Sequence, residues 1–164
     1  MSLFRIFGVL LTLAAVTALG ACSRAPAVPK TPPPPPAPKG IFISTNDCAA
    51  TGKLTGDECG KAIDGAIAMH QRLARAYKSL TKCAASEGED RCDKAVDGMY
   101  RARLQAFFVT LSKPPSAEPL YPPKKKPDVA AFRSATQPSI SARDEELMVS
   151  PAALSIAYAN SRLP

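Results

Sequence analysis

The chain has 164 residues, of which 17 are proline and 6% are aromatic, and its formal net charge is +7 at pH 7. This length leaves room for one domain, and so much proline with so few aromatic residues excludes a packed core that extends over the whole chain. The folded part must therefore be smaller than the chain.

The first 21 residues have the pattern of an export signal. Met1–Arg5 is short and basic, Ile6–Leu19 is almost continuously apolar, and two small residues, Gly20 and Ala21, follow. The apolar run would span about 21 Å as a helix, less than the roughly 30 Å of a bilayer's hydrocarbon core. We therefore expect a signal peptide over residues 1–21 rather than a permanent transmembrane helix.

The end of this segment is more specific than a general cleavage site. Leu19-Gly20-Ala21-Cys22 resembles the bacterial lipobox, which implies that the thiol of Cys22 is diacylated and that the chain is cut before it. Acyl chains contribute about 0.8 kcal/mol per buried CH₂, so they would hold the protein at a membrane permanently. The alternative is an ordinary signal peptide that is cut nearby and leaves Cys22 as a free thiol.

The lipobox also carries an expectation about location. Ser23 follows the cysteine, so the resemblance to bacterial lipoproteins implies no inner-membrane retention signal of the aspartate kind. We expect a palmitate-bearing lipoprotein of the cell envelope that faces the periplasm, at the outer rather than the inner membrane. The membrane is then its first partner, through the lipid on Cys22.

Residues 22–40 form a proline-rich linker behind this anchor. Proline fixes φ and lacks an amide hydrogen, so the run Pro32–Pro36 cannot join a helix or a sheet and favours polyproline II. Such a segment would reach on the order of 55 Å between Ser23 and Gly40. A spacer between membrane and domain is the expected role, and a docking site for a polyproline-binding domain is the alternative.

Residues 41–113 are expected to form a small folded domain. A domain of this size buries little apolar surface, and in oxidising compartments such domains gain stability from disulfides. With Cys22 lipidated, an even number of cysteines remains, as a periplasmic disulfide framework requires. These are Cys48, Cys59, Cys83 and Cys92.

Two helices are predicted within this domain. Thr55-Gly56-Asp57-Glu58 matches a capping box, and apolar residues recur at helical spacing from Cys59 to Leu80. A second helix is expected from the region of Ser86–Asp90 to Leu111, and its end, QAFFVTL, equally fits a short buried strand. The predicted fold class is mainly α: a disulfide-stapled helical hairpin flanked by proline-rich disordered segments.

Helix geometry selects one pairing of the four cysteines. Cys59 lies in the first turn of the first helix and Cys83 just past its end, roughly 30 Å apart, whereas a disulfide allows a Cα separation of about 6 Å. Cys92 begins an antiparallel second helix and therefore lies beside Cys83. The predicted disulfides are Cys48–Cys59 and Cys83–Cys92, each contributing about 3 kcal/mol by closing a loop in the unfolded chain.

No cofactor, metal ion or enzymatic activity is predicted. The cysteine spacing contains no C-x-x-C pair, the motif of thiol exchange and of zinc knuckles. His70 is the one histidine and falls on the apolar side of the first helix, where packing is a more common role than ligation or catalysis. The acidic residues from Glu87 to Asp93 lack the alternating spacing of a calcium loop and fit helix-start charges.

The order of these motifs is similar to that of a known family. The pattern NDC…GDECGKAIDGAIAMHQRLARAYKSLTKC…EGEDRCDKAVDGMY resembles the predicted bacterial lipoproteins called domain of unknown function 1190. The resemblance implies an exported, cysteine-bridged domain and no particular activity. It rests on Cys48, Cys59, Ala66, Tyr77, Cys83, Cys92 and Gly98, and Pro119-Leu120-Tyr121 extends it.

The chain changes character after the domain. Residues 114–149 are proline-rich and basic without periodicity, and we expect them to be irregular or disordered. Within them, Lys124, Lys125 and Lys126 are candidates for contact with anionic lipid headgroups or other envelope phosphates, and a solvated charge run is the alternative. Residues 150–164 are expected to carry a short helix from Pro151, with Ser150 as its N-cap.

Two functional hypotheses follow from this organisation. The first is a non-enzymatic structural or protein-interaction module, with a protein of the envelope as its partner. The second is a binding module for anionic envelope polymer or lipid through the basic tail. Because a basic protein that is exported and lipid-anchored meets anionic envelope surfaces, we expect no nucleic-acid partner.

Overall fold

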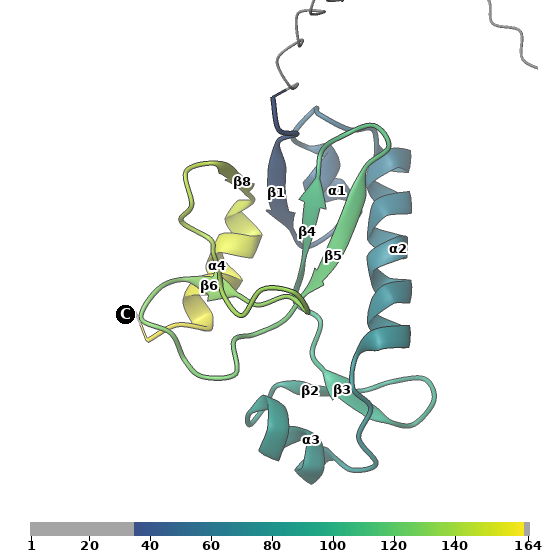
Figure 1. The fold of residues 1–164 in the computed structure, drawn as a ribbon, viewed down its shortest axis with the longest axis vertical. Helices are drawn as coiled ribbons and strands as arrows, with labels where there is room; N and C mark the ends of the chain where they lie inside the picture. The colour runs from purple at the N-terminus through teal and green to yellow at the C-terminus, as the bar shows by residue number, and fades with distance from the viewer. Residues whose placement is uncertain (1–34, 163–164) are drawn as a thin grey trace, which may run out of the picture. The chain divides into compact units, whose positions relative to one another are not determined.

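A computed structural model gives the structure of residues 35–162, which form a mixed α/β fold (Figure 1). Residues 1–34, which contain the expected signal peptide, Cys22 and most of the expected linker, lie outside these described residues. The prediction of a mainly α helical hairpin is wrong, because strands occupy much of the chain after residue 91 and one strand precedes the first helix.

A four-stranded sheet organises the fold. Its strands lie in the order β5 (Ser116–Leu120), β4 (Ala106–Thr110), β1 (Lys39–Phe42) and β8 (Leu147–Val149). Strand β1 is antiparallel to β4 and parallel to β8, so it is an interior strand of the sheet. It begins at Lys39, so the last two residues expected in the linker, Lys39 and Gly40, belong to the folded domain. Successive side chains of a strand point to opposite faces, and Ile41 and Phe42 accordingly enter different apolar cores.

One face of the sheet is covered by α2 (Gly56–Leu73), which follows the short helix α1 (Thr45–Ala49) (Figure 1). The predicted capping box is confirmed at its start: the backbone N–H of Thr55 donates to Glu58 at 2.8 Å, and the N–H of Glu58 donates to the Thr55 hydroxyl at 3.2 Å. The core between this helix and the sheet contains Phe42, Ile63, Ala66, Phe107 and Val109.

The opposite face packs against the C-terminal part of the described chain. Helix α4 (Pro151–Ala159) lies there with the two-stranded pair β6 (Ala131–Phe132) and β7 (Ile140–Ser141) (Figure 1). Ser150 caps this helix as predicted, with its hydroxyl accepting a hydrogen bond from the N–H of Ala153 at 3.1 Å.

The first of the two predicted helices ends at Leu73, although the apolar pattern that predicted it continues to Leu80. Helix α2 stops at Leu73, because Ala74 adopts an extended conformation with ψ of 133°. A separate helix, α3 (Leu80–Glu87), begins after Ser79, which caps it. Tyr77, between the two helices, exchanges backbone hydrogen bonds with Tyr100 at 2.8 and 2.9 Å.

The second predicted helix is wrong. Its residues form β2 (Cys92–Lys94), β3 (Tyr100–Ala102) and β4, and only the alternative reading of QAFFVTL as a strand is confirmed. Asp97-Gly98 makes the turn between β2 and β3, with Gly98 at a φ of +78° that favours glycine. The Asp97 carboxylate accepts from the Met99 N–H and from both terminal nitrogens of Arg101, and the Arg101 bonds lower the pKa of Asp97 to about 2.

The predicted pairing of the four cysteines is confirmed. Cys48–Cys59 links α1 to the first turn of α2, and Cys83–Cys92 links α3 to β2, with Cα separations of 6.0 and 6.2 Å. All four cysteines are buried. Each bridge is therefore part of a local packing unit rather than a surface link.

The segment after residue 113 is folded, which corrects the expectation of a disordered flank. It supplies β5, β6, β7 and β8, and it buries Leu120, Phe132 and Ile140. Pro119 pairs with Phe107 on β4 and lies in β5, an edge strand, which is where sheets tolerate proline. The proline-rich composition therefore led to a wrong prediction for a segment that contains an edge strand and part of the core against α4.

Candidate functional site

The three lysines singled out from the sequence line an open groove of about 680 Å³. We call it the lysine groove. One wall is residues 123–127, which include Lys124, Lys125 and Lys126, and the other is residues 133–139. This volume lies within the range of about 300–1,000 Å³ that is typical of ligand-binding clefts.

Prolines hold the lysine wall in place. Pro122 and Pro123 are buried and Pro127 closes the segment, while the three lysines between them are exposed. Because proline restricts φ, this short loop loses little conformational entropy when a ligand binds. The carbonyl of Pro122 also accepts a hydrogen bond from Nε of Arg133 at 2.9 Å, which ties the two walls together.

The opposite wall is held by side-chain hydrogen bonds. The buried Ser134 hydroxyl accepts from the N–H groups of Thr136 and Gln137 at 3.2 and 3.1 Å. The Thr136 hydroxyl donates to the carboxylate of Glu118 on β5 at 3.2 Å. This wall therefore presents hydroxyl and amide groups on a fixed turn, next to four cationic side chains.

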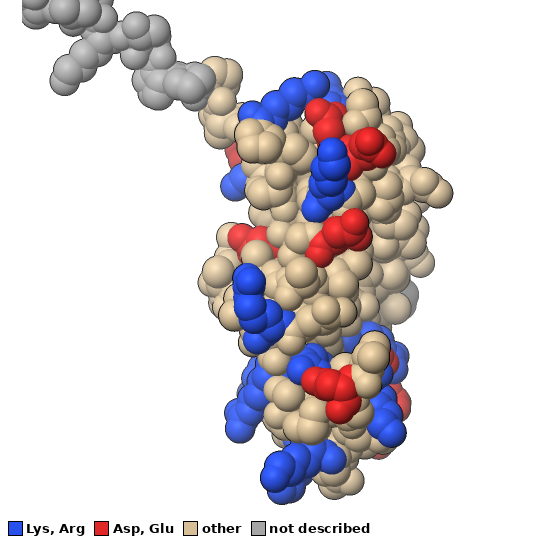
Figure 2. Space-filling model, turned by 90° about the vertical axis from the view of Figure 1, so that its right-hand side faces the viewer, with Lys and Arg blue, Asp and Glu red and all other residues tan. Residues whose placement is uncertain are grey.

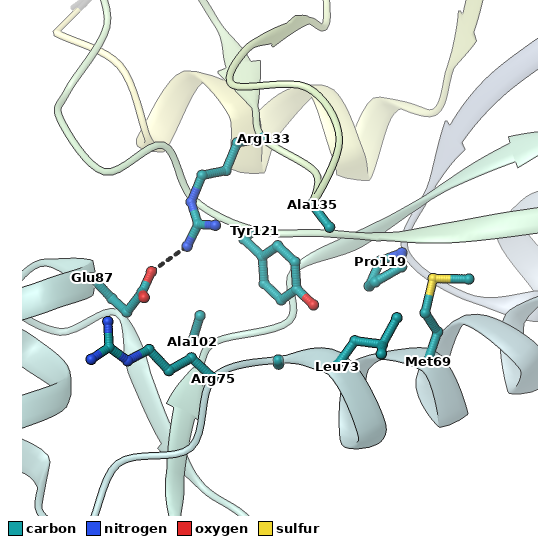
Figure 3. A pocket seen from close by; sticks show the side chains of 10 residues that line it. Met69, Leu73, Arg75, Glu87, Ala102, Pro119, Tyr121, Arg133 and Ala135 are labelled. Carbon is teal, nitrogen blue, oxygen red and sulfur yellow. Dashed lines mark hydrogen bonds and ion pairs between the residues drawn. The ribbon is translucent and has the colours of Figure 1, made fainter.

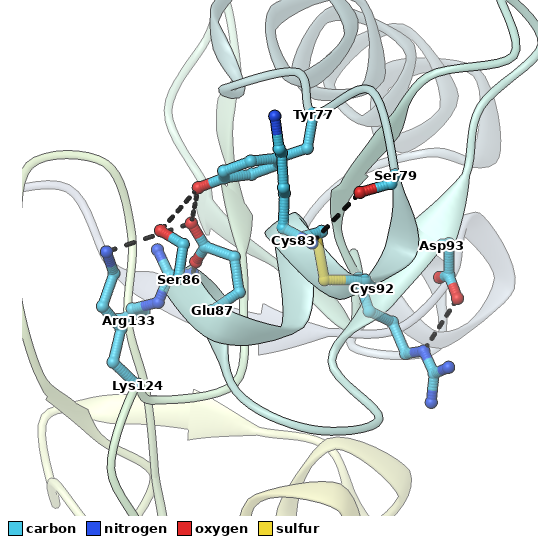
Figure 4. The surroundings of a disulfide bond; sticks show 11 residues. Tyr77, Ser79, Cys83, Ser86, Glu87, Cys92, Asp93, Lys124 and Arg133 are labelled. Carbon is cyan, nitrogen blue, oxygen red and sulfur yellow. Dashed lines mark hydrogen bonds and ion pairs between the residues drawn. A yellow bond between two sulfur atoms is a disulfide. The ribbon is translucent and has the colours of Figure 1, made fainter.

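The two cations nearest the protein interior share one buried carboxylate. Glu87 at the end of α3 is 6% exposed, forms an ion pair with Arg133, and lies 3.9 Å from Nζ of Lys124 (Figure 4). The Tyr77 hydroxyl donates to the same carboxylate at 2.7 Å. Glu87 thus pairs with two of the four cations of the groove.

The disulfide Cys83–Cys92 lies in the same structural unit as Glu87. Cys83 is one helical turn before Glu87 on α3, and it packs with Tyr77, Cys92 and Tyr100 (Figure 4). The Tyr77 hydroxyl that contacts Glu87 therefore belongs to a side chain that packs directly on the bridge. The disulfide is structural support for this end of the groove.

A second cavity adjoins the lysine groove and shares Arg133 and Ala135 with it. We call it the Tyr121 pocket. Its volume is about 170 Å³. The lining residues are Met69, Leu73, Ala74, Arg75, Glu87, Ala102, Pro119, Tyr121, Arg133 and Ala135 (Figure 3).

Tyr121 stands between Arg133 and His70. The Arg133 guanidinium lies 5.0 Å from the centre of the Tyr121 ring, and the Tyr121 hydroxyl is 3.0 Å from Nδ1 of His70. Burial raises the pKa of Tyr121. Burial, and then the positive charge of Arg101, lower the pKa of His70. His70 therefore favours its neutral form and serves here as a packing and hydrogen-bonding partner.

Comparison with protein families adds one finding. The family model described as "Protein of unknown function (DUF1190)" matches residues 37–122, more than half of the chain. The chain belongs to this DUF1190 family. No curated protein and no solved structure matches it.

The DUF1190 match covers only part of the site. It contains both disulfides, Glu87 and most of the Tyr121 pocket, and it ends before Lys124. The family description gives no activity. Any role for the lysine groove must therefore be argued from this chain's own residues.

The structure brings together some of the predicted site residues and adds others. Lys124–Lys126 lie on one wall of the groove, Arg133 lies on the other, and Glu87 contacts Lys124 and Arg133. No pattern in the sequence marks Arg133. Glu87 was expected to be a helix-start charge, yet it ends α3 and is buried. Cys22 lies outside the described residues.

Charged residues elsewhere are mixed in sign. On the face seen in Figure 2, lysine and arginine side chains are most numerous towards the lower end, which holds α3, β2 and β3, and acidic side chains lie among them. Two ion pairs there join Arg101 to Asp97 and Arg103 to Asp93. The lysine groove differs, because the described residues that line it include four cations and no carboxylate.

Two other kinds of site were sought in residues 35–162. No group of three or more histidine, cysteine, aspartate or glutamate side chains there is placed to hold a metal ion. Among the same residues, no helix has the length and apolar character needed to cross a membrane.

Proposed function

We propose that this protein is an exported, lipid-anchored component of the bacterial cell envelope whose folded part binds a phosphate-bearing anionic polymer. The observation that carries the proposal is the lysine groove, where Lys124, Lys125, Lys126 and Arg133 converge without a carboxylate in the lining. Cations placed together on fixed walls attract a multivalent anion more strongly than the same charges scattered over a surface.

The construction of the groove favours binding of oxyanions. Arginine and lysine side chains donate charge-assisted hydrogen bonds to phosphate oxygens, and hydroxyl and backbone N–H groups add neutral donors. The groove offers both kinds, since the side chains of Gln137 and Ser139 belong to residues of the lining. The Thr136 hydroxyl and the backbone N–H groups of Thr136 and Gln137 already donate to Glu118 and Ser134, and they hold this wall in shape. The open form of the groove suits a chain that passes through it better than a small molecule that must be enclosed.

A polymer is favoured over the headgroups of the anchoring membrane. The expected spacer of on the order of 55 Å would hold the folded part away from the bilayer to which Cys22 is attached. Surface charge attraction falls off within about 8–10 Å at physiological salt, so lipid phosphates of that membrane would contribute little at this distance. Lipid binding is a separate outcome of the test below.

The binding test compares two triple variants of the full mature protein. One variant carries Lys124→Ser, Lys125→Ser and Lys126→Ser. The other carries the same change at Lys53, Lys61 and Lys78, which are exposed and lie outside the groove. Both variants have the same net charge, so a difference between them reports position rather than charge.

Titration with sodium polyphosphate is the readout. At about 1 kcal/mol per lysine, the groove variant is expected to bind about 100-fold more weakly than the wild type, with a smaller loss for the control variant. Equal losses in the two variants would contradict the proposal. So would binding to phosphatidylglycerol vesicles with no binding to polyphosphate, because the ligand would then be lipid.

The anchoring part of the proposal has its own test. Leu19-Gly20-Ala21-Cys22 supports lipidation, so labelled palmitate is expected to enter the wild-type protein and not a Cys22→Ala variant. Incorporation into both, or into neither, would contradict the lipid anchor and leave the binding proposal to stand on the groove alone.

Binding is proposed rather than catalysis. His70, the one histidine of the chain, is hydrogen-bonded to Tyr121 and lines neither the lysine groove nor the Tyr121 pocket. The cysteines that could act as nucleophiles in the described part of the chain are joined in disulfides. The groups that converge on the groove can therefore hold an anion but supply no nucleophile with an adjacent base.

A further inference from the structure

The Tyr121 pocket has an apolar end and a charged end. Met69, Leu73 and Pro119 lie together at one end, and Arg75, Glu87 and Arg133 lie at the other, with Tyr121 between them (Figure 3). From this division we propose that the pocket receives one apolar side chain of a protein partner, and that acidic residues flank this side chain. This inference concerns a different cavity and a different ligand from the proposed polymer binding.

The apolar end is incomplete in the protein alone. Leu73 is the last residue of α2 and is 64% exposed, whereas the buried residues of this helix, Cys59, Ala62, Ile63 and Ala66, lie in its earlier turns. Met69, one turn earlier, is half-buried, and Pro119 on β5 is buried beneath them. An apolar group that entered beside Leu73 would remove this side chain from water, with a gain of about 25 cal/mol per Å² buried.

The size of the pocket favours a side chain over a free small molecule. Its volume of about 170 Å³ is well below the range of about 300–1,000 Å³ typical of small-molecule sites. A cavity of this size suits a single anchoring side chain, the kind of contact that dominates the affinity of many protein interfaces.

The charges at the other end favour an acidic neighbour. Among the described residues that line the pocket, two are basic, Arg75 and Arg133, and one is acidic, Glu87. Lys124 lies 3.9 Å from the same Glu87 carboxylate and adds a third positive charge at this end. A partner with a carboxylate next to its anchoring side chain would match this excess, and a lysine there would be repelled.

Arg75 is well placed to make that contact. Its residue is exposed, and its guanidinium lies 5.2 Å from the centre of the Tyr77 ring, a cation–π contact that favours this position of the side chain. Arginine forms bidentate hydrogen bonds with carboxylates, which gives direction as well as affinity. Arg133, in contrast, is already paired with Glu87.

The test uses three short, capped peptides with the full mature protein. The first has leucine between glutamates, the second has alanine between glutamates, and the third has leucine between lysines. Binding is measured by calorimetry at low salt. We expect the first peptide to bind at least about tenfold more tightly than the second, because the apolar contact is lost with alanine. The lysine-flanked peptide is expected to bind more weakly still.

Two single variants locate the contact. Leu73→Ser removes an exposed side chain from the pocket, and Leu80→Ser removes one that is 51% exposed on α3 and lies outside it. Leu73→Ser is expected to weaken the glutamate-flanked leucine peptide about tenfold, and Leu80→Ser to leave it unchanged. Polyphosphate binding should be the same in both variants, which separates this inference from the proposed function.

Three results would overturn the inference. One is equal binding of the leucine and alanine peptides, which would mean that no apolar pocket is used. Another is equal weakening by Leu73→Ser and Leu80→Ser. The third is the absence of binding by every peptide while polyphosphate still binds.

Discussion

Glu87 lines the Tyr121 pocket and pairs with two cations of the lysine groove. Its buried carboxylate contacts Arg133, Lys124 and Tyr77, so it acts as an internal anion for cations that an external ligand would also use. A buried carboxylate of this kind is tolerated because each of its oxygens has a partner. Because Arg133 and Lys124 already pair with Glu87, we expect Glu87 to lower the affinity of the lysine groove for an external anion.

Substitution of Glu87 tests this competition. Glu87→Gln keeps the shape but removes the negative charge, so Arg133 and Lys124 become more available and polyphosphate is expected to bind more tightly. The free energy of unfolding in urea is expected to fall by about 1–3 kcal/mol, because charged hydrogen bonds become neutral. Glu89→Gln, at an exposed position, is the control. Weaker polyphosphate binding in Glu87→Gln would show that Glu87 organises the groove rather than competing for it.

His70 gives the protein an expected response to pH. Its pKa in the folded protein is below the usual value of about 6.5, chiefly because it is partly buried. As the pH falls below about 6.5, His70 gains a proton in the unfolded chain before it does in the folded protein, so the free energy of unfolding decreases. Above this pH both states are neutral at His70 and its contribution is constant.

The measurement is urea unfolding of the wild type and of His70→Gln between about pH 7.5 and 5.5, above the usual titration range of carboxylates. The wild type is expected to lose stability towards the lower pH, and the variant to lose less. An equal or steeper decrease in His70→Gln would contradict a lowered pKa for His70.

At the scale of elements, the two disulfides stabilise different units. They close loops of similar length, with sequence separations of 11 and 9, so loss of either is expected to lower stability by about 3 kcal/mol. Only Cys83–Cys92 supports the helix that carries Glu87. Replacing the two cysteines of each bridge by serine, one bridge at a time, therefore separates an effect on overall stability from an effect on ligand affinity at the groove.

Polyphosphate titration of these variants is the readout, under conditions where both remain folded. Cys83→Ser with Cys92→Ser is expected to change the affinity, because Tyr77 and Glu87 lose their fixed positions. Cys48→Ser with Cys59→Ser, at the far end of α2, is expected to leave the affinity unchanged. A change of the same size in both variants would contradict a specific role for Cys83–Cys92.

Local signals in the sequence predicted the starts of helices well. Thr55 with Glu58 and Ser150 with Pro151 mark the first residues of α2 and α4, because capping chemistry depends only on neighbouring residues. The end of α2 was missed because the apolar spacing continues to Tyr77 and Leu80, whereas Tyr77 pairs with Tyr100 and Leu80 begins α3. Asp97-Gly98 was an available signal for the β2–β3 hairpin, since this dipeptide favours tight turns between strands.

The candidate site was only partly predictable. Lys124–Lys126 stand out in the sequence as a charge run. Arg133 and Glu87 do not, because their roles come from contacts between segments 46 residues apart. The expectation of disorder after residue 113 failed for a related reason: prolines that disfavour helices are compatible with an edge strand and with fixed loops.

At the scale of the whole molecule, the described residues form a small α/β domain, and its cationic groove is built on the segment that follows the DUF1190 match. The central claim is that residues 122–139 form the polymer-binding surface. Affinity measurements on variants test this claim indirectly, because any variant can alter the fold as well as the contact.

The most direct measurement is hydrogen–deuterium exchange of the mature protein, followed by mass spectrometry, with and without sodium polyphosphate. If polyphosphate binds in the groove, we expect slower exchange only in peptides that contain residues 122–139, with α2 and the β2–β3 hairpin unchanged. Protection centred on the hairpin or on α2, or no protection at a concentration that saturates binding, would contradict this claim.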